Sequence, residues 1–158
     1  MITNHDGLLK AIQIAMDAEK RAAEFYADAA QKTGVLAETL FRQLEKFELA
    51  HYKKLVTLSK SLSEDGKFIT YAGSDIQTPK PGEMRKIEEE KKLSLMQVID
   101  IAIDSEKRAA ETYGEMAEKT LDSNGKAMFS LLAEEENDHY KMLKDAYWQL
   151  NQTGEWGW

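Results

Sequence analysis

The sequence contains no cysteine, only two prolines and no long apolar run. Without cysteine, the chain can form no disulfide, no zinc ribbon, no thiolate-ligated iron site and no cysteine nucleophile. No apolar stretch approaches the ~20 residues that span a bilayer, and the N-terminus lacks the basic start and apolar run of a signal peptide. We therefore expect a cytoplasmic protein without a membrane segment.

Positive charge is also scarce. The 158 residues include 21 Lys and Arg against 28 Asp and Glu, which gives a net charge of −7. A nucleic-acid binder needs a basic face, and attachment to an anionic membrane needs a basic patch. We therefore expect neither a nucleic acid nor a membrane as partner. The length fits one domain with a core of its own.

The chain repeats itself. Residues 12–26 return at 99–113 with an offset of 87, and both copies contain the run Glu-Lys-Arg-Ala-Ala-Glu. After a one-residue insertion the register resumes at an offset of 88, as the segments 41–55 and 129–143 show. Glycine and proline are sparse within both copies, as long helices require. The protein is therefore two copies of one helix pair.

Apolar periodicity and helix-stop signals predict where the helices lie. Gly34 separates the first two helices and the turn-forming run 122–125 separates the last two. Connections this short make each pair antiparallel. The four predicted helices cover residues 5–33, 36–62, 94–121 and 124–150.

A crossover of about thirty residues, 63–93, joins the two pairs. A connection of that length lets the second and third helices of a bundle run parallel. We therefore predict an all-α fold, with one four-helix bundle over residues 1–150. The remaining segment, 151–158, has no periodicity and is predicted to be irregular, packing on the bundle or on a partner.

Polar residues interrupt the apolar stripe at the middle of each predicted helix. Core-facing positions recur at spacings of three and four residues. Glu at position i and His at i+3 share a helix face, so both can bind one metal ion. Four carboxylates and two imidazoles should thus converge on one level of the bundle. These residues are Glu19, Glu48 with His51, Glu106, and Glu136 with His139.

The alternative is that these acids are ordinary solvated residues. For any single glutamate that is the better interpretation, because acidic side chains in helices usually face water. The combination argues against it, since two of the three histidines follow a glutamate by three residues at repeat-equivalent positions. An uncompensated buried carboxylate costs several kcal/mol. Two divalent cations would balance four carboxylates, so the sequence predicts a two-metal site.

The ligand types restrict the metal. Carboxylate and imidazole without thiolate suit two iron ions, while manganese or zinc can occupy the same kind of site. We expect Glu48 and Glu136 to bridge the two ions. The remaining ligands, one acid and one imidazole for each ion, are Glu19 with His51 and Glu106 with His139.

This pattern is that of ferritin-like di-iron proteins. More narrowly, the helical part of the chain resembles the rubrerythrin family. The resemblance implies a ferritin-like bundle with a non-haem di-iron centre that reacts with hydrogen peroxide or dioxygen in oxidative-stress defence. It also makes a homodimer the expected assembly. The residues that carry it are Glu19 with Tyr26, Glu48-Leu49-Ala50-His51, Glu106 with Tyr113, and Glu136-Asn137-Asp138-His139.

The sequence departs from the family in two ways. Full rubrerythrins have a second domain in which cysteines hold an iron that supplies electrons; this chain has no cysteine, so we expect an external electron-donor protein. Rubrerythrins also carry a further glutamate three residues after the third-helix ligand, where this chain has Ala109. That glutamate is tied to movement of one iron during peroxide reduction. A symmetric six-ligand site is more similar to a ferroxidase or oxidase centre.

Four further positions near the acids have more than one interpretation each. Tyr26 and Tyr113, two turns beyond the acids of their helices, either donate to the carboxylates, or are oxidised, or simply pack in the core. Ala22 and Ala109 either leave room for a small oxidant or allow close helix contact.

Three functions remain open at this stage. The leading hypothesis is an oxidoreductase that disposes of peroxide or oxygen. The second is a ferroxidase or iron-handling protein, although cage-forming ferritins need a fifth helix that this sequence does not show. The third is a metal-stabilised interaction module without redox turnover, whose aromatic tail binds a partner.

Overall fold

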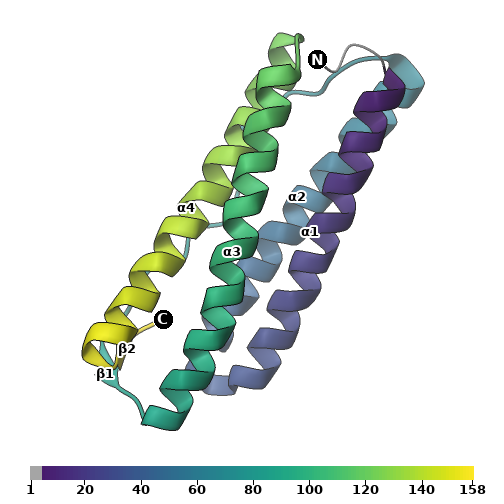
Figure 1. Cartoon of the computed structure of the whole chain (residues 1–158). Helices are drawn as coiled ribbons and strands as arrows, with labels where there is room; N and C mark the ends of the chain where they lie inside the picture. The colour runs from purple at the N-terminus through teal and green to yellow at the C-terminus, as the bar shows by residue number, and fades with distance from the viewer. Residues whose placement is uncertain (1–4) are drawn as a thin grey trace.

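Four long helices form two antiparallel pairs in the computed structural model, which describes residues 5–158. Figure 1 shows α1 and α2 as one pair and α3 and α4 as the other. The prediction of an all-α, ferritin-like bundle is confirmed. The first four residues of the predicted domain lie outside the described residues. The helices are α1 (His5–Thr33), α2 (Glu38–Asp65), α3 (Glu89–Lys119) and α4 (Ser123–Thr153).

The helix ends follow local signals in the sequence. A short 3₁₀ turn, η1 (Gly34–Leu36), separates α1 from α2. The Asp122 side chain caps α4 by accepting a hydrogen bond from the backbone N–H of Gly125 at 3.0 Å. Gly66 ends α2 in the left-handed region, with φ of 65°. The turns within the two pairs and the end of α2 therefore lie at residues that favour a helix end.

One helix boundary differs from the prediction by a full turn. The third helix was expected from residue 94, whereas α3 begins at Glu89. Its first turn contains Glu89 and Glu90, whose negative charges are favourable at a helix N-terminus. The acidic run before the apolar periodicity is thus part of the helix.

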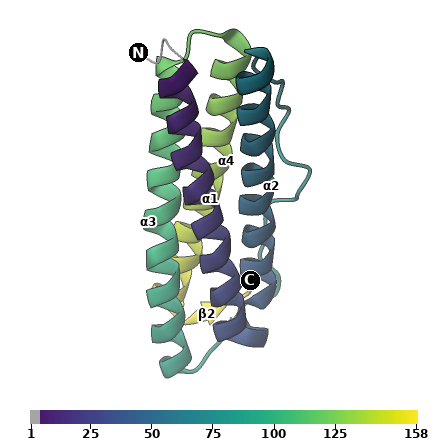
Figure 2. The ribbon, with the colours of Figure 1, turned by 90° about the vertical axis from the view of Figure 1, so that its right-hand side faces the viewer.

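The crossover runs along the outside of the bundle from the end of α2 to the start of α3 (Figure 2). It lets α2 and α3 run parallel, as predicted. Phe68, near its start, packs edge-on against Phe129 of α4, with ring centroids 6.4 Å apart. A Cβ atom at Gly125 would lie 2.5 Å from the Phe68 ring, so this close approach requires glycine.

The C-terminal segment forms secondary structure, which corrects the prediction of an irregular tail over 151–158, while its packing on the bundle agrees with that prediction. Helix α4 continues to Thr153, and β2 (Glu155–Trp156) then pairs antiparallel with β1 (Arg85–Lys86) of the crossover. Trp156 is only 1% exposed, and its Nε1 donates to the Leu36 carbonyl at 2.9 Å. Burial of this large ring fixes a segment that has no periodicity of its own.

The apolar core has two parts, one toward each end of the bundle. One part surrounds Phe41 and Ile99, and the other surrounds Ile12 and Phe129. The layer between them, at mid-height, is where the sequence places its buried acids. Among the described residues, no helix combines the length and apolarity that crossing a membrane requires.

We predict that Trp156→Ala lowers the free energy of unfolding by about 3–5 kcal/mol, because it removes a fully buried aromatic ring. Urea unfolding followed by circular dichroism measures this change. Trp148, which is 61% exposed, provides the matched control. Trp148→Ala should stay within about 0.5 kcal/mol of wild type. Equal losses in the two variants would mean that the tail does not hold the bundle together.

Candidate metal centre

All six predicted ligand residues are buried in the layer between the two apolar clusters. Each of the six residues is at most 3% exposed. Each helix contributes: α1 and α3 supply one glutamate each, whereas α2 and α4 each supply a glutamate and a histidine. The structure therefore brings together Glu19, Glu48, His51, Glu106, Glu136 and His139.

These side chains form two overlapping groups of four. Within each group, one ligand atom from every residue lies within 4.8 Å of the others. The groups share Glu48 and Glu136, the residues expected to bridge. The first group adds Glu19 and His51; the second adds Glu106 and His139. Two ions could thus each have three carboxylates and one imidazole nearby.

Both imidazoles turn the same ring nitrogen toward the acids. The Nδ1 atom of His51 lies 2.7 Å from Glu136 Oε1 and 3.4 Å from Glu19 Oε1. The Nδ1 atom of His139 lies 3.7 Å from Glu106 Oε2. Nδ1 is therefore the atom that each histidine offers to a metal.

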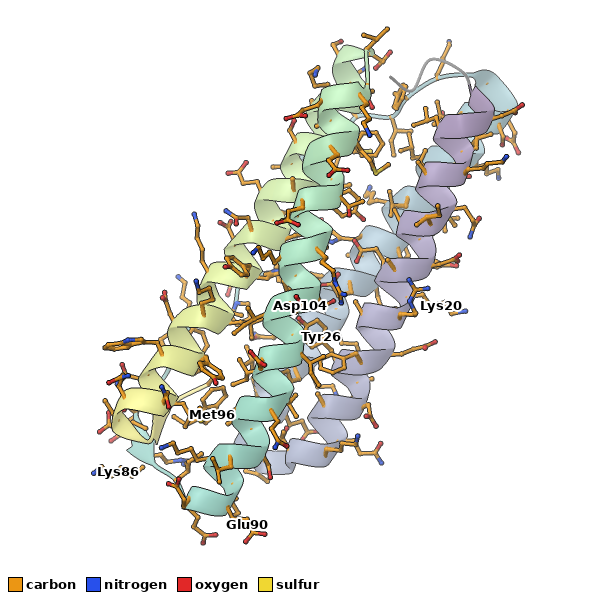
Figure 3. All side chains as sticks on the ribbon, in the orientation of Figure 1. Lys20, Tyr26, Lys86, Glu90, Met96 and Asp104 are labelled. Atoms are coloured by element: carbon orange, nitrogen blue, oxygen red, sulfur yellow. The ribbon has the colours of Figure 1, made fainter. Side chains whose placement is uncertain are left out.

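The two tyrosines connect the repeats across the site. The Tyr26 hydroxyl of α1 donates to Glu106 Oε1 of α3 at 2.6 Å, and the Tyr113 hydroxyl of α3 donates to Glu19 Oε1 of α1 at 2.5 Å. Figure 3 labels Tyr26 between α1 and α3. Its ring also stacks on Phe41. Donation to the carboxylates and core packing, which the sequence left as alternatives, thus occur together.

Several buried polar atoms of the centre have no hydrogen-bond partner within the part of the chain that the structure describes. Leaving a buried donor or acceptor unsatisfied costs about 1–3 kcal/mol, more when it is charged. Such atoms need an explanation, and bound metal provides one. Their oxygen and nitrogen chemistry fits iron, manganese or zinc. The four that a metal in the centre could contact are Glu48 Oε1, Glu106 Oε2, Glu136 Oε2 and His139 Nδ1; the fifth, His51 Nε2, faces away from the acids toward Glu135.

Burial favours the protonated form of the two shared acids, Glu48 and Glu136. Burial, reinforced by the charges of the neighbouring glutamates, raises the pKa of Glu48 and of Glu136 well above 4.5. Burial alone would also raise the pKa of Glu106, but the neighbouring Glu136 and His139 and the hydrogen bond from Tyr26 lower it to about 2. The shared glutamates therefore hold protons more readily than exposed glutamates do.

One functional residue was missed by the sequence reasoning. Glu135 of α4 places its Oε2 atom 3.6 Å from His51 Nε2, the nitrogen that faces away from the acids. It accepts hydrogen bonds from the Tyr71 hydroxyl and the Ser74 backbone N–H of the crossover. Burial alone would raise the pKa of Glu135, but its contacts with His51 and Tyr71 lower it to about 2.

A cleft of about 450 Å³ lies between α1 and α3 and reaches the centre. Ala22 and Ala109 line it, so these small residues border open space and not a close helix contact. Ile14 and Ile101, at repeat-equivalent positions, are 65% and 58% exposed at its rim. The cleft thus brings open space up to the buried centre. The centre residues that line it are Glu19, Glu48, Glu106, Tyr113 and Glu136.

The metal-free protein should lose stability as pH rises. The raised pKa values of Glu48 and Glu136 mean that their stabilising contribution is present below about pH 4.5 and is lost as pH rises through the higher folded values. We predict that Tm in chelator falls as pH rises above about 4.5 and these protons leave. Thermal melts followed by circular dichroism test this. Metal-loaded protein should show a much smaller fall, and identical slopes would contradict the prediction.

Removing a ligand should lower the metal content. We predict fewer than two ions per chain for Glu136→Ala and for His139→Ala, because each removes a side chain that faces the buried cluster. Elemental analysis after metal loading and desalting measures the count. Glu111→Ala is the control, since Glu111 is exposed on α3. If this control loses metal as the other variants do, the ligand assignment is wrong.

Comparison with known proteins agrees with this geometry. The family model described as Rubrerythrin matches residues 72–151, which is half of the chain. A solved structure of a hypothetical protein from Pyrococcus furiosus is 27% identical, with 91% of this chain and 90% of that chain covered and a TM-score of 0.67. No curated protein matches the sequence.

Proposed function

The chain belongs to the rubrerythrin family, and on that premise we propose that it holds two iron ions that react with hydrogen peroxide or dioxygen. The reaction serves oxidative-stress defence, and an external donor protein supplies the electrons. The observation that carries this proposal is the pair of overlapping four-residue groups that share Glu48 and Glu136. Shared carboxylates suit two neighbouring ions better than two separate ones.

When bound by the two groups that share Glu48 and Glu136, two ferrous ions would supply the two electrons that, with two protons, convert one hydrogen peroxide into two waters. The protein residues prepare the site for that chemistry. Glu106 has one oxygen occupied by the Tyr26 hydroxyl, while its Oε2 is free of partners among the described residues and faces His139 Nδ1. The tyrosine thus orients the carboxylate so that one oxygen points at the metal position.

The tyrosine hydroxyls remain protonated. Burial and the charge of Glu106 raise the pKa of Tyr26 well above 10, and burial and the charge of Glu19 do the same for Tyr113. They therefore act as hydrogen-bond donors throughout the physiological range. Tyr113 also lines the cleft, where its hydroxyl, whose one hydrogen is donated to Glu19, can accept a hydrogen bond from hydrogen peroxide.

The cleft between α1 and α3 supports access by a small oxidant. Its volume of about 450 Å³ is many times that of a water molecule, which takes up roughly 30 Å³. Its walls near the centre are small and apolar at Ala22 and Ala109. Both features favour this cleft as the route by which peroxide or dioxygen reaches the buried acids.

A ferroxidase is the second candidate, and Ala109 favours it. The resemblance to rubrerythrins implies a glutamate at this position, where it would provide an additional ligand for one ion. Ala109 borders the cleft and offers no oxygen atom. The six ligand candidates that remain are related by the repeat, which is the symmetry expected of a ferroxidase centre.

Rapid mixing separates the two candidates. We predict that the anaerobic diferrous protein is oxidised faster by hydrogen peroxide than by dioxygen at equal concentrations, because the centre serves peroxide removal. Stopped-flow absorbance follows the formation of the ferric product. The matched control is Glu136→Ala, which should lose most of the signal.

Faster oxidation by dioxygen would instead establish the ferroxidase. Absence of reaction with both oxidants, in protein that holds two ions, would leave only a metal-stabilised bundle and would contradict the proposed function.

A further inference from the structure

We propose that Glu135 is a positioning residue for His51, and that it makes the two metal positions unequal. The His51 position is the one completed by Glu19 and His51; the His139 position is completed by Glu106 and His139. We infer that the His51 position binds its ion more tightly and fills first. This inference rests on the two-metal part of the proposed function.

The contact that supports this inference lies on the outer side of the imidazole. Nδ1 of His51 faces the acids of the centre, while Nε2 lies 3.6 Å from Glu135 Oε2. A histidine that binds metal usually directs its other N–H at a carboxylate or carbonyl, which fixes the tautomer and increases the basicity of the ligating nitrogen. At 3.6 Å Glu135 is an ion-pair partner of Nε2 just beyond hydrogen-bond distance, and it is the carboxylate placed to act in this way on His51.

Glu135 is itself held by the crossover. Its Oε1 accepts a hydrogen bond from the Tyr71 hydroxyl at 2.5 Å, and its Oε2 accepts one from the Ser74 backbone N–H at 3.3 Å. Its side chain is 14% exposed, so water screens its charge only partly. An anion with two donors and little solvent is a fixed electrostatic partner for the imidazole.

The other histidine has a different neighbour. The repeat offset of 88 relates Glu135 to Phe47 of α2. The Phe47 ring packs edge-on against the His139 ring, with centroids 4.4 Å apart. No carboxylate of residues 5–158 lies within the 4.0 Å ion-pair distance of His139 Nε2, whereas one does for His51. The six ligand residues are therefore equivalent under the repeat, whereas Glu135, beside His51, and Phe47, beside His139, differ in chemistry.

This difference should appear in metal affinity. Loss of an outer carboxylate partner typically weakens binding by about 10–100-fold. We therefore expect the two ions to bind in two steps that differ by about that factor. The tighter step belongs to the His51 position.

Cobalt(II) titration of the full-length, metal-free protein tests the inference without redox turnover. Calorimetry gives the two affinities, and the visible absorption of the first cobalt ion reports the environment of its imidazole ligand. For Glu135→Gln we expect the tighter step to weaken by about 10–100-fold, so that the two steps merge, and the first-ion spectrum to shift. Glu134→Gln, the same change at an exposed neighbour, should behave as wild type.

A second variant keeps the carboxylate. Tyr71→Phe removes one donor to Glu135, and we expect it to weaken the tighter step in the same direction by a smaller factor. If circular dichroism shows that Glu135→Gln does not fold, the Tyr71→Phe variant tests the role of Glu135 in its place.

The outcomes are distinguishable. Two cobalt ions in wild type, with unchanged affinities and spectrum in the Glu135 or Tyr71 variant, would overturn this inference alone. A single indistinguishable binding step in wild type would also overturn it. Fewer than two ions in wild type would overturn the two-metal function and the inference with it.

Discussion

Four carboxylates buried at one level of a helical bundle constrain the rest of the molecule. Each ionised acid in such a place costs several kcal/mol unless an opposite charge or hydrogen bonds compensate. The structure meets part of this demand with two histidines and two tyrosine hydroxyls, and the raised pKa values of the shared acids, Glu48 and Glu136, favour their neutral forms. Polar atoms still lack partners among the described residues. Metal ions would complete the compensation, and the apolar clusters on both sides hold the acids where ions can reach them.

The sequence predicted those features that depend on regular spacing of residues along a helix or on the internal repeat. The apolar ladder identified α1 with the bounds that the structure has, and the internal repeat predicted two antiparallel pairs. The same ladder placed Glu19 and Glu106 on the inner face of their helices, where the structure buries them. A helix fixes the direction of its side chains, so regular spacing was sufficient to bring distant residues together.

The features that could not be predicted depend on irregular segments. Glu135 is the middle residue of three consecutive glutamates, and only its contacts with Tyr71 and Ser74 distinguish it. Those contacts come from a crossover that has no periodicity. The burial of Trp156 against the bundle is likewise a tertiary contact. The repeat also predicts equal surroundings for the two histidines, whereas Phe47 stands where symmetry would require an acid.

X-ray absorption spectroscopy of the iron-loaded protein tests the central claim most directly. If buried acids are tolerated because two cations share them, the spectrum should show oxygen and nitrogen ligands and a second iron at about 3.5–4 Å. An isolated iron without a metal neighbour, in protein that contains two ions per chain, would contradict the account.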